Sequence, residues 1–257
     1  MDVRHYEGRD GVRLAYRETG QGRPVVLLHG YFSTAEETWV RPGHAAEIAS
    51  LGHRVIMPDM RGHGDSDRPH DPAAYPRDML TDDGFALVEH LGLTDYDLGG
   101  YSIGGRTTTR MLARGATPAR AIVAGQGLNS VTKISRPGRS HFYKVLTGLG
   151  TFEPGSPEWH TEQTLHRLGG DPVALLGVRG AFTETPIEAL AGITMPVLVV
   201  RGEDDDAADA ERLAAALPAG TYASIPGDHQ SAVSEPVHLG AAIAGFLGAA
   251  SRPLEQA

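Results

Sequence analysis

Ser102 lies in the run Gly100-Tyr101-Ser102-Ile103-Gly104, which matches G-x-S-x-G, a turn that holds a serine hydroxyl at the edge of a sheet. A serine hydroxyl becomes a good nucleophile only when a general base removes its proton, and the base needs an acid to hold its tautomer and orientation. With 33 Gly in 257 residues, the run alone is a weak signal. Its context strengthens it, because a strand-like run precedes Ser102 and a helix-like run follows.

A base and an acid are available later in the chain. The acidic run at 203–206 comes directly after an apolar run at 196–200, and His229 comes soon after another at 221–225. Ligand sites of open α/β sheets lie at the carboxyl ends of the strands, so these side chains are expected near Ser102. We therefore predict His229 as the base. The candidate acids are Asp204, Asp205 and Asp206, of which Asp206 is also placed to cap a following helix.

The elements that must position these residues alternate between short apolar runs and longer helix-like segments. This alternation is typical of a parallel sheet with helices on both faces. Near-continuous apolar strands suit a sheet that is covered on both faces. The predicted strands are 24–28, 54–57, 95–98, 121–124, 196–200 and 221–225, with an antiparallel hairpin within 3–17, and the predicted helices are 79–91, 103–113, 207–217 and 235–250.

The segment 128–194 breaks the alternation. It separates two predicted strands by well over 50 residues, far more than a simple crossover needs. Ser156-Pro157 and Asp171-Pro172 each place a capping side chain before a proline at a first helical position. We therefore predict a core at 1–127 and 195–257, interrupted by an inserted helical module at 128–194.

Composition and charge exclude several classes of function. The chain has 23 Lys+Arg against 32 Asp+Glu, a net charge of −9, and no basic cluster, so a nucleic-acid partner is not expected. The sparse basic stretch at 136–139 is expected to be a solvated loop. The same net charge disfavours strongly anionic substrates. The absence of cysteine excludes thiol nucleophiles and iron–sulfur ligation.

The location of the protein is expected to be cytoplasmic. The first residues are charged where a secretory signal needs an apolar run, and the longest apolar stretch, 241–250, is far shorter than the roughly 20 residues that span a bilayer. No membrane partner is therefore expected, and the tail after 251 is expected to fray. The oligomeric state stays open.

No cofactor or metal is expected. The chain contains neither G-x-G-x-x-G nor G-x-x-x-x-G-K-[ST], the loops that cradle phosphates. One cluster of potential ligands matches no zinc spacing. It comprises His63, Asp65, Asp67, His70 and Asp71.

Several motifs in order give the chain a resemblance to the α/β-hydrolase superfamily, in particular the cap-bearing branch of small esterases, epoxide hydrolases, dehalogenases, cofactor-free haloperoxidases and C–C bond hydrolases. Leu28-His29-Gly30 resembles the His-Gly oxyanion turn of that family, and residues 59–66 resemble its D-x-R-G-x-G-x-S loop. The serine turn, G-x-x-D at 202–205 and the late His229 complete the set. The resemblance covers nearly the whole chain and implies an eight-stranded, mostly parallel sheet with an inserted helical cap.

The resemblance also implies roles for single residues. Ser102 matches the nucleophile, His229 the base and Asp205 the orienting acid. The backbone N–H groups of Ile103 and Tyr31 match the oxyanion hole, with Phe32 as the alternative to Tyr31. His29 and His63 are expected to shape loops.

A serine at this turn also discriminates within the superfamily. Epoxide hydrolases and haloalkane dehalogenases place an aspartate there, so Ser102 disfavours both activities and predicts an acyl-enzyme. We expect a serine hydrolase that acts on a small or medium carboxylic ester. The alternatives are a C–C hydrolase, a thioesterase or lactonase, a haloperoxidase or perhydrolase, an acyltransferase, or a ligand receptor without turnover.

Aromatic residues are the candidates for a substrate pocket, although ordinary packing is an equally good reading for each of them. Tyr31 belongs to this group beside its backbone role. The other candidates are Phe32, Trp39, Phe142, Tyr143, Trp159 and Phe182.

Overall fold

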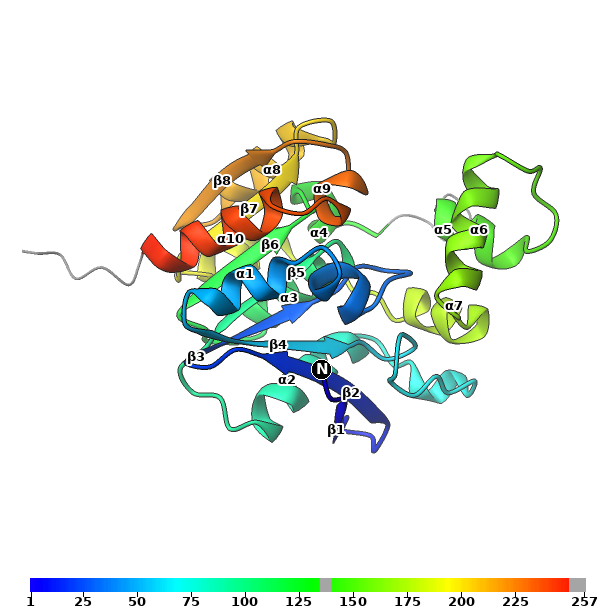
Figure 1. The fold of residues 1–257 in the computed structure, drawn as a ribbon, viewed down its shortest axis with the longest axis horizontal. Helices are drawn as coiled ribbons and strands as arrows, with labels where there is room; N and C mark the ends of the chain where they lie inside the picture. The colour runs from blue at the N-terminus through cyan, green and yellow to red at the C-terminus, as the bar shows by residue number, and fades with distance from the viewer. Residues whose placement is uncertain (135–139, 250–257) are drawn as a thin grey trace, which may run out of the picture.

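An eight-stranded sheet forms the centre of the computed structural model, which describes residues 1–134 and 140–249 (Figure 1). The strand order is β1-β2-β4-β3-β5-β6-β7-β8; β2 pairs antiparallel with β1 and β4, and the other pairs are parallel. The predicted eight-stranded, mostly parallel sheet is confirmed. The strands are β1 (Arg4–Glu7), β2 (Arg13–Thr19), β3 (Arg23–Leu28), β4 (His53–Asp59), β5 (Asp97–Tyr101), β6 (Arg120–Ala124), β7 (Val197–Gly202) and β8 (Gly220–Ile225).

Strand β5 differs most from its predicted range. It begins at Asp97 and continues through two glycines to Tyr101, whereas the apolar pattern ended at residue 98. Glycine carries no strand signal, but a β-carbon at Gly99 would lie 2.9 Å from Ile122 Cβ on the neighbouring strand. Close packing between β5 and β6 therefore decides the residue type there.

Helices cover both faces of the sheet. On one face lie α2 (Met79–His90), α3 (Ile103–Ala113) and α8 (Ala207–Ala216), whose apolar side chains share one buried cluster. On the other face lie α1 (His44–Ser50) and α10 (His238–Ala249), which share a second cluster with a short π-helical segment, η1 (Glu36–Val40). The turn that carries Ser102, between β5 and α3, therefore stands on a core that is packed from both sides.

The last predicted helix, 235–250, starts later in the structure, and a separate short helix precedes its predicted start. Helix α9 (Ser231–Ser234) ends at Glu235, whose backbone is extended (φ −81°, ψ 133°) because it precedes Pro236. Helix α10 starts at His238. The predicted end at residue 250, the tail after 251 and the basic stretch at 136–139 lie outside the described residues.

The β6–β7 connection, residues 125–196, contains most of the remaining helices. Ser156 Oγ accepts a hydrogen bond from Trp159 N (3.2 Å) and Asp171 Oδ1 accepts one from Val173 N (3.0 Å), so both predicted caps hold helix starts. Figure 1 shows α5, α6 and α7 together at one end of the sheet, away from the helices on its faces. The elements of the connection are α4 (Leu128–Thr132), α5 (His141–Thr147), α6 (Pro157–Arg167), α7 (Pro172–Gly180) and the 3₁₀ turn η4 (Ile187–Gly192). A further 3₁₀ turn, η2 (Pro72–Ala74), lies before α2, outside the connection.

Helix α7 ties this connection to the sheet. Tyr31 Oη, after β3, donates a hydrogen bond to the carbonyl of Leu175 at 2.6 Å. A β-carbon at Gly62, after β4, would lie 3.0 Å from Val178 Cγ2. The connection therefore packs against the loops that follow the carboxyl ends of β3 and β4. Within the part of the chain that is described, no helix combines the length and apolar character needed to cross a bilayer.

Candidate active site

Ser102 occupies a strained turn between β5 and α3. Its backbone has φ 54° and ψ −116°, a conformation that a residue with a β-carbon rarely adopts. The flanking glycines allow it, because a β-carbon at Gly100 would lie 2.3 Å from the carbonyl carbon of Gly104, and one at Gly104 would lie 2.2 Å from Leu28 O. The sequence therefore lets strand and helix approach closely enough to present the Ser102 hydroxyl at the sheet edge.

His229 lies against Ser102. Its Nε2 is 3.0 Å from Ser102 Oγ. The loop that carries it turns at Gly227 (φ 97°) and is held by Asp228, whose Oδ1 accepts hydrogen bonds from the backbone N–H groups of Gln230 (3.0 Å) and Ser231 (2.8 Å). This loop follows β8, at the carboxyl edge predicted for it.

Asp205 is the one of the three candidate acids that contacts His229. Its Oδ2 lies 3.0 Å from His229 Nδ1, and its Oδ1 accepts hydrogen bonds from Arg201 Nη2 (2.7 Å) and Asp206 N (2.9 Å). Asp204 is exposed, and Asp206 caps α8 by accepting from Asp209 N at 3.1 Å. The three neighbouring carboxylates therefore have three different surroundings.

The electrostatics of Asp205 favour its charged form. Burial by itself raises the pKa of Asp205, but the hydrogen bonds from His229 and Arg201 outweigh burial and hold the pKa well below its usual range. An ionised Asp205 accepts the Nδ1–H of His229, which leaves the Nε2 lone pair directed at the Ser102 hydroxyl. The arrangement is chemically able to remove the proton of Ser102.

The turn after β3 lies beside the serine. A β-carbon at Gly30 would lie 3.7 Å from Ser102 Cβ, and Tyr31 lines the same cavity as Ser102. Phe32 has φ 57°, so the chain bends sharply directly after Tyr31. Ile103 is the first residue of α3, where a helix leaves its backbone N–H without an intrahelical partner. Both segments predicted to supply oxyanion donors therefore flank Ser102.

Two buried histidines support the turn after β3. His29 is fully buried, with Nδ1 2.7 Å from Gly30 O and Nε2 accepting a hydrogen bond from Met60 N at 2.9 Å. His63 packs on it with ring centroids 5.0 Å apart. Burial lowers the pKa of His29, and burial together with nearby His29 lowers the pKa of His63 to about 3. Both side chains are therefore neutral structural groups.

A cavity of about 630 Å³ opens beside Ser102. Its volume suits a small molecule. Three of the predicted aromatic side chains line it together with Ser102 and Ile103: Tyr31, Phe142 and Phe182.

The other four aromatic candidates lie elsewhere. Trp39 is completely buried in the core cluster under α1 and α10, so its large apolar surface is used for packing. Phe32 packs in a separate cluster with side chains of α5, α6 and α7, and it lines a different cavity that shares Tyr31 and Phe142 with the first. Tyr143 and Trp159 do not line this cavity; Trp159 instead stacks edge-on against His160 at 5.0 Å. Sequence reasoning selected them by residue type alone, which does not distinguish a pocket from a core.

Polar residues of the cavity were not anticipated from the sequence. Arg106 was the most accessible to prediction, because it follows Ser102 by four residues and so lies one helical turn along α3. The others come from segments that only the fold brings together. The unanticipated polar lining is Arg106, Gln126, Asn129, Ser130, Lys133, Ser140, Arg179, Arg201 and Asp209.

The histidine and aspartate cluster at 63–71 disperses into separate contacts. Asp65 pairs with Arg17, His70 Nε2 lies 2.7 Å from Asp171 Oδ2, and Asp71 caps η2. Among the described residues, no three His, Asp or Glu side chains are grouped so as to hold a metal ion.

Comparisons with known proteins place this chain in a family. The family model described as the alpha/beta hydrolase fold matches residues 23–180. The chain is 30% identical over 226 residues to a non-heme haloperoxidase from Rhodococcus erythropolis, covering 76% of this chain and 80% of that protein. It is 32% identical to epoxide hydrolase 2 from Siraitia grosvenorii, over 37% of this chain and 29% of that protein.

A solved structure agrees over almost the whole length. The structure of a thermophilic esterase from Thermogutta terrifontis superposes with a TM-score of 0.76 at 25% identity, covering 96% of this chain and 98% of that one. The sheet order, the serine turn and these matches lead to one conclusion: the chain belongs to the alpha/beta hydrolase fold family.

Proposed function

We propose that this protein is a serine hydrolase that cleaves small or medium carboxylic esters through an acyl-enzyme. The observation that carries the proposal is the continuous chain of contacts from Ser102 Oγ to His229 Nε2 (3.0 Å) and from His229 Nδ1 to Asp205 Oδ2 (3.0 Å). Nucleophile, base and acid stand in the order that acyl transfer requires.

The reaction proceeds in two halves. His229 takes the proton of Ser102 as Oγ attacks the ester carbonyl carbon, and the tetrahedral oxyanion forms beside the backbone N–H groups of Ile103 and Tyr31. The intermediate collapses as His229 returns the proton to the leaving alcohol. Water, activated by His229, then attacks the acyl-enzyme and releases the carboxylic acid. The His229 side chain is 45% exposed, so water reaches the acyl-enzyme.

The β6–β7 connection acts in this proposal as a cap on a core formed by 1–127 and 195–257. Phe142, Arg179 and Phe182 from the connection line the cavity that also contains Ser102. Substrate selection therefore depends on side chains from both parts. The solved esterase relative supports ester hydrolysis, and the serine at position 102 argues against the epoxide chemistry of other relatives.

Turnover of aryl esters tests the proposal. Esters of graded acyl length are incubated with the wild-type protein and with Ser102→Ala, and a fluorophosphonate adduct is located by mass spectrometry. We expect hydrolysis by the wild type, a loss of at least about 10³-fold in Ser102→Ala, and an adduct on Ser102. Equal turnover by both proteins would rule out the serine mechanism, and absence of an adduct would favour a ligand receptor.

Perhydrolysis is a second candidate, favoured by the match to the non-heme haloperoxidase. Hydrogen peroxide replaces water in attacking the acyl-enzyme, which gives a peracid that oxidises halide. Bromination of a phenol by wild type and Ser102→Ala, with acetate and peroxide present, tests this activity. Acetate-dependent bromination by the wild type alone supports it, and equal rates oppose it.

A further inference from the structure

The cavity beside Ser102 is rich in cations although the whole chain is acidic. Arg106, Lys133, Arg179 and Arg201 line it, against the carboxylates of Asp206 and Asp209. The net charge of −9 led to the opposite expectation for substrates, because a total charge does not say where the charges lie.

Several of these charges already have partners. Arg201 pairs with Asp205 at 2.7 Å. Asp209 pairs with Arg212 and accepts a hydrogen bond from Asn129 N at 3.1 Å, while Asp206 caps α8. The acidic groups of the lining therefore do not neutralise Arg106.

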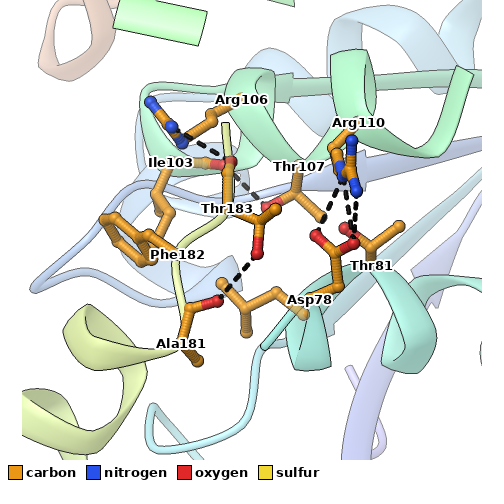
Figure 2. Close-up of a pocket in the computed structure, with 10 residues that line it drawn as sticks. Asp78, Thr81, Ile103, Arg106, Thr107, Arg110, Ala181, Phe182 and Thr183 are labelled. Carbon is orange, nitrogen blue, oxygen red and sulfur yellow. Dashed lines mark hydrogen bonds and ion pairs between the residues drawn. The ribbon is translucent and has the colours of Figure 1, made fainter. Parts of the chain in front are cut away.

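Arg106 and Arg110 lie one turn apart on α3 but have different surroundings. Arg110 donates to both carboxylate oxygens of Asp78, with distances of 2.6 to 3.1 Å (Figure 2). Arg106 is directed away from Asp78 in the same view and donates to the backbone carbonyls of Thr183 (3.1 Å), Lys133 (3.2 Å) and Ser130. Its Nε is buried without a hydrogen-bond partner, and no ion pair to it occurs among residues 1–134 and 140–249.

A second guanidinium, that of Arg179, lies against the same aromatic ring as Arg106. The guanidinium carbon of Arg179 is 5.0 Å from the centre of the Phe182 ring, and that of Arg106 is 5.8 Å from the same centre. Burial and the charge of Arg179 lower the pKa of Arg106 to about 10, while the Glu184 carboxylate acts in the opposite direction, so the side chain still carries its charge at neutral pH.

We propose that the natural substrate is an ester that also carries a carboxylate, and that Arg106 and Arg179 bind this carboxylate beside the ring of Phe182. The proposal rests on the ester hydrolysis proposed above. Guanidinium groups match the planar geometry of carboxylates with paired hydrogen bonds. Arg106 lies about 6 Å from Ser102 along the axis of α3, so a short dicarboxylic chain attached to Ser102 reaches it.

Matched pairs of esters test the proposal. The monoethyl esters of succinic, glutaric and adipic acid are compared with ethyl butanoate, pentanoate and hexanoate, and 4-acetoxybutanoate is compared with butyl acetate. The first series places the carboxylate on the acyl side and the last pair places it on the alcohol side. We expect a preference of at least about 10-fold in kcat/KM for the anionic member of one of these series.

Variants of the two arginines locate the effect. Arg106→Gln and Arg179→Gln are each expected to lose about 10- to 100-fold in kcat/KM on the anionic ester, mainly through KM, with little change on its neutral partner. Arg106→Lys keeps the charge but loses the hydrogen bonds to three backbone carbonyls. It is expected to retain part of the preference for the anionic ester. Arg110→Gln is the matched control, expected to leave the ratio between the two esters unchanged.

The results separate this inference from the proposed function. An equal ratio of anionic to neutral turnover in the wild type and in both glutamine variants overturns the carboxylate site while ester hydrolysis stands. If no ester is hydrolysed, binding of glutarate to the wild type is measured by titration calorimetry. Binding that Arg106→Gln abolishes supports the carboxylate site without ester hydrolysis, and no binding overturns the site.

Discussion

Tyr101 holds His229 through the backbone. The Tyr101 hydroxyl donates a hydrogen bond to the carbonyl oxygen of His229 at 2.7 Å, and the two rings are 5.4 Å apart. Burial raises the pKa of Tyr101, so the hydroxyl remains a donor throughout the physiological range. Because Tyr101 directly precedes Ser102, one strand end positions both the proposed nucleophile and its base.

Tyr101→Phe is therefore expected to lower kcat about fivefold with little change in KM. The loss of one hydrogen bond of about 1 kcal/mol allows the His229 loop to move, and that energy corresponds to about fivefold in rate. Steady-state ester hydrolysis and the rate of fluorophosphonate labelling measure the effect.

Tyr222→Phe is the matched control for this variant. The buried hydroxyl of Tyr222 has no hydrogen-bond partner among the described residues, so its removal is expected to cost nothing. An unchanged labelling rate in Tyr101→Phe would show that Tyr101 stabilises the fold without positioning His229.

Asp205→Asn is expected to reduce kcat by about 10⁴-fold while the fold is kept. An asparagine donor facing Nδ1 favours the tautomer that points a proton at Ser102, and the base is lost. Asp204→Asn serves as control, because Asp204 is exposed and His229 contacts the neighbouring Asp205. Comparable losses in the two variants would contradict the assignment of Asp205.

Gly104→Ala is expected to destabilise the protein by about 1–3 kcal/mol, because the new β-carbon would lie 2.2 Å from Leu28 O and force β3 and α3 apart. Gly245→Ala in α10 meets no atom within 4 Å and is expected to stabilise by about 0.5–1 kcal/mol. Thermal unfolding measures both. Equal effects of the two substitutions would show that the close approach at the serine turn is not required.

His63 is expected to make the free energy of unfolding depend on pH in the acidic range. The unfolded chain protonates this histidine near pH 6.5, whereas the folded protein does so only near its pKa of about 3. The unfolded state therefore binds more protons within this window, and stability falls as the pH falls, by up to about 1.4 kcal/mol per pH unit. His63→Gln is expected to reduce this slope in urea unfolding between pH 6.5 and 4.5, and an unchanged slope would contradict it.

Much of the fold was predictable because its signals are local. Continuous apolar runs located the strands, and glycine spacing around Ser102 located the turn. The errors have local causes as well. The glycines of β5 gave no signal for the end of that strand, and the last helix starts only at His238 because Pro236 keeps Glu235 extended.

The sequence by itself determined which side chains were available for acyl transfer: Ser102, His229 and an aspartate among 204–206, each placed after a strand. Only the tertiary structure decided which aspartate faces His229, that Trp39 belongs to the core, and that Arg106 and Arg179 both lie against the ring of Phe182. The reason is physical. A nucleophile turn is built from neighbouring residues, whereas a cavity is lined by α3, α4, α7 and β7, whose approach depends on packing over long separations in the chain.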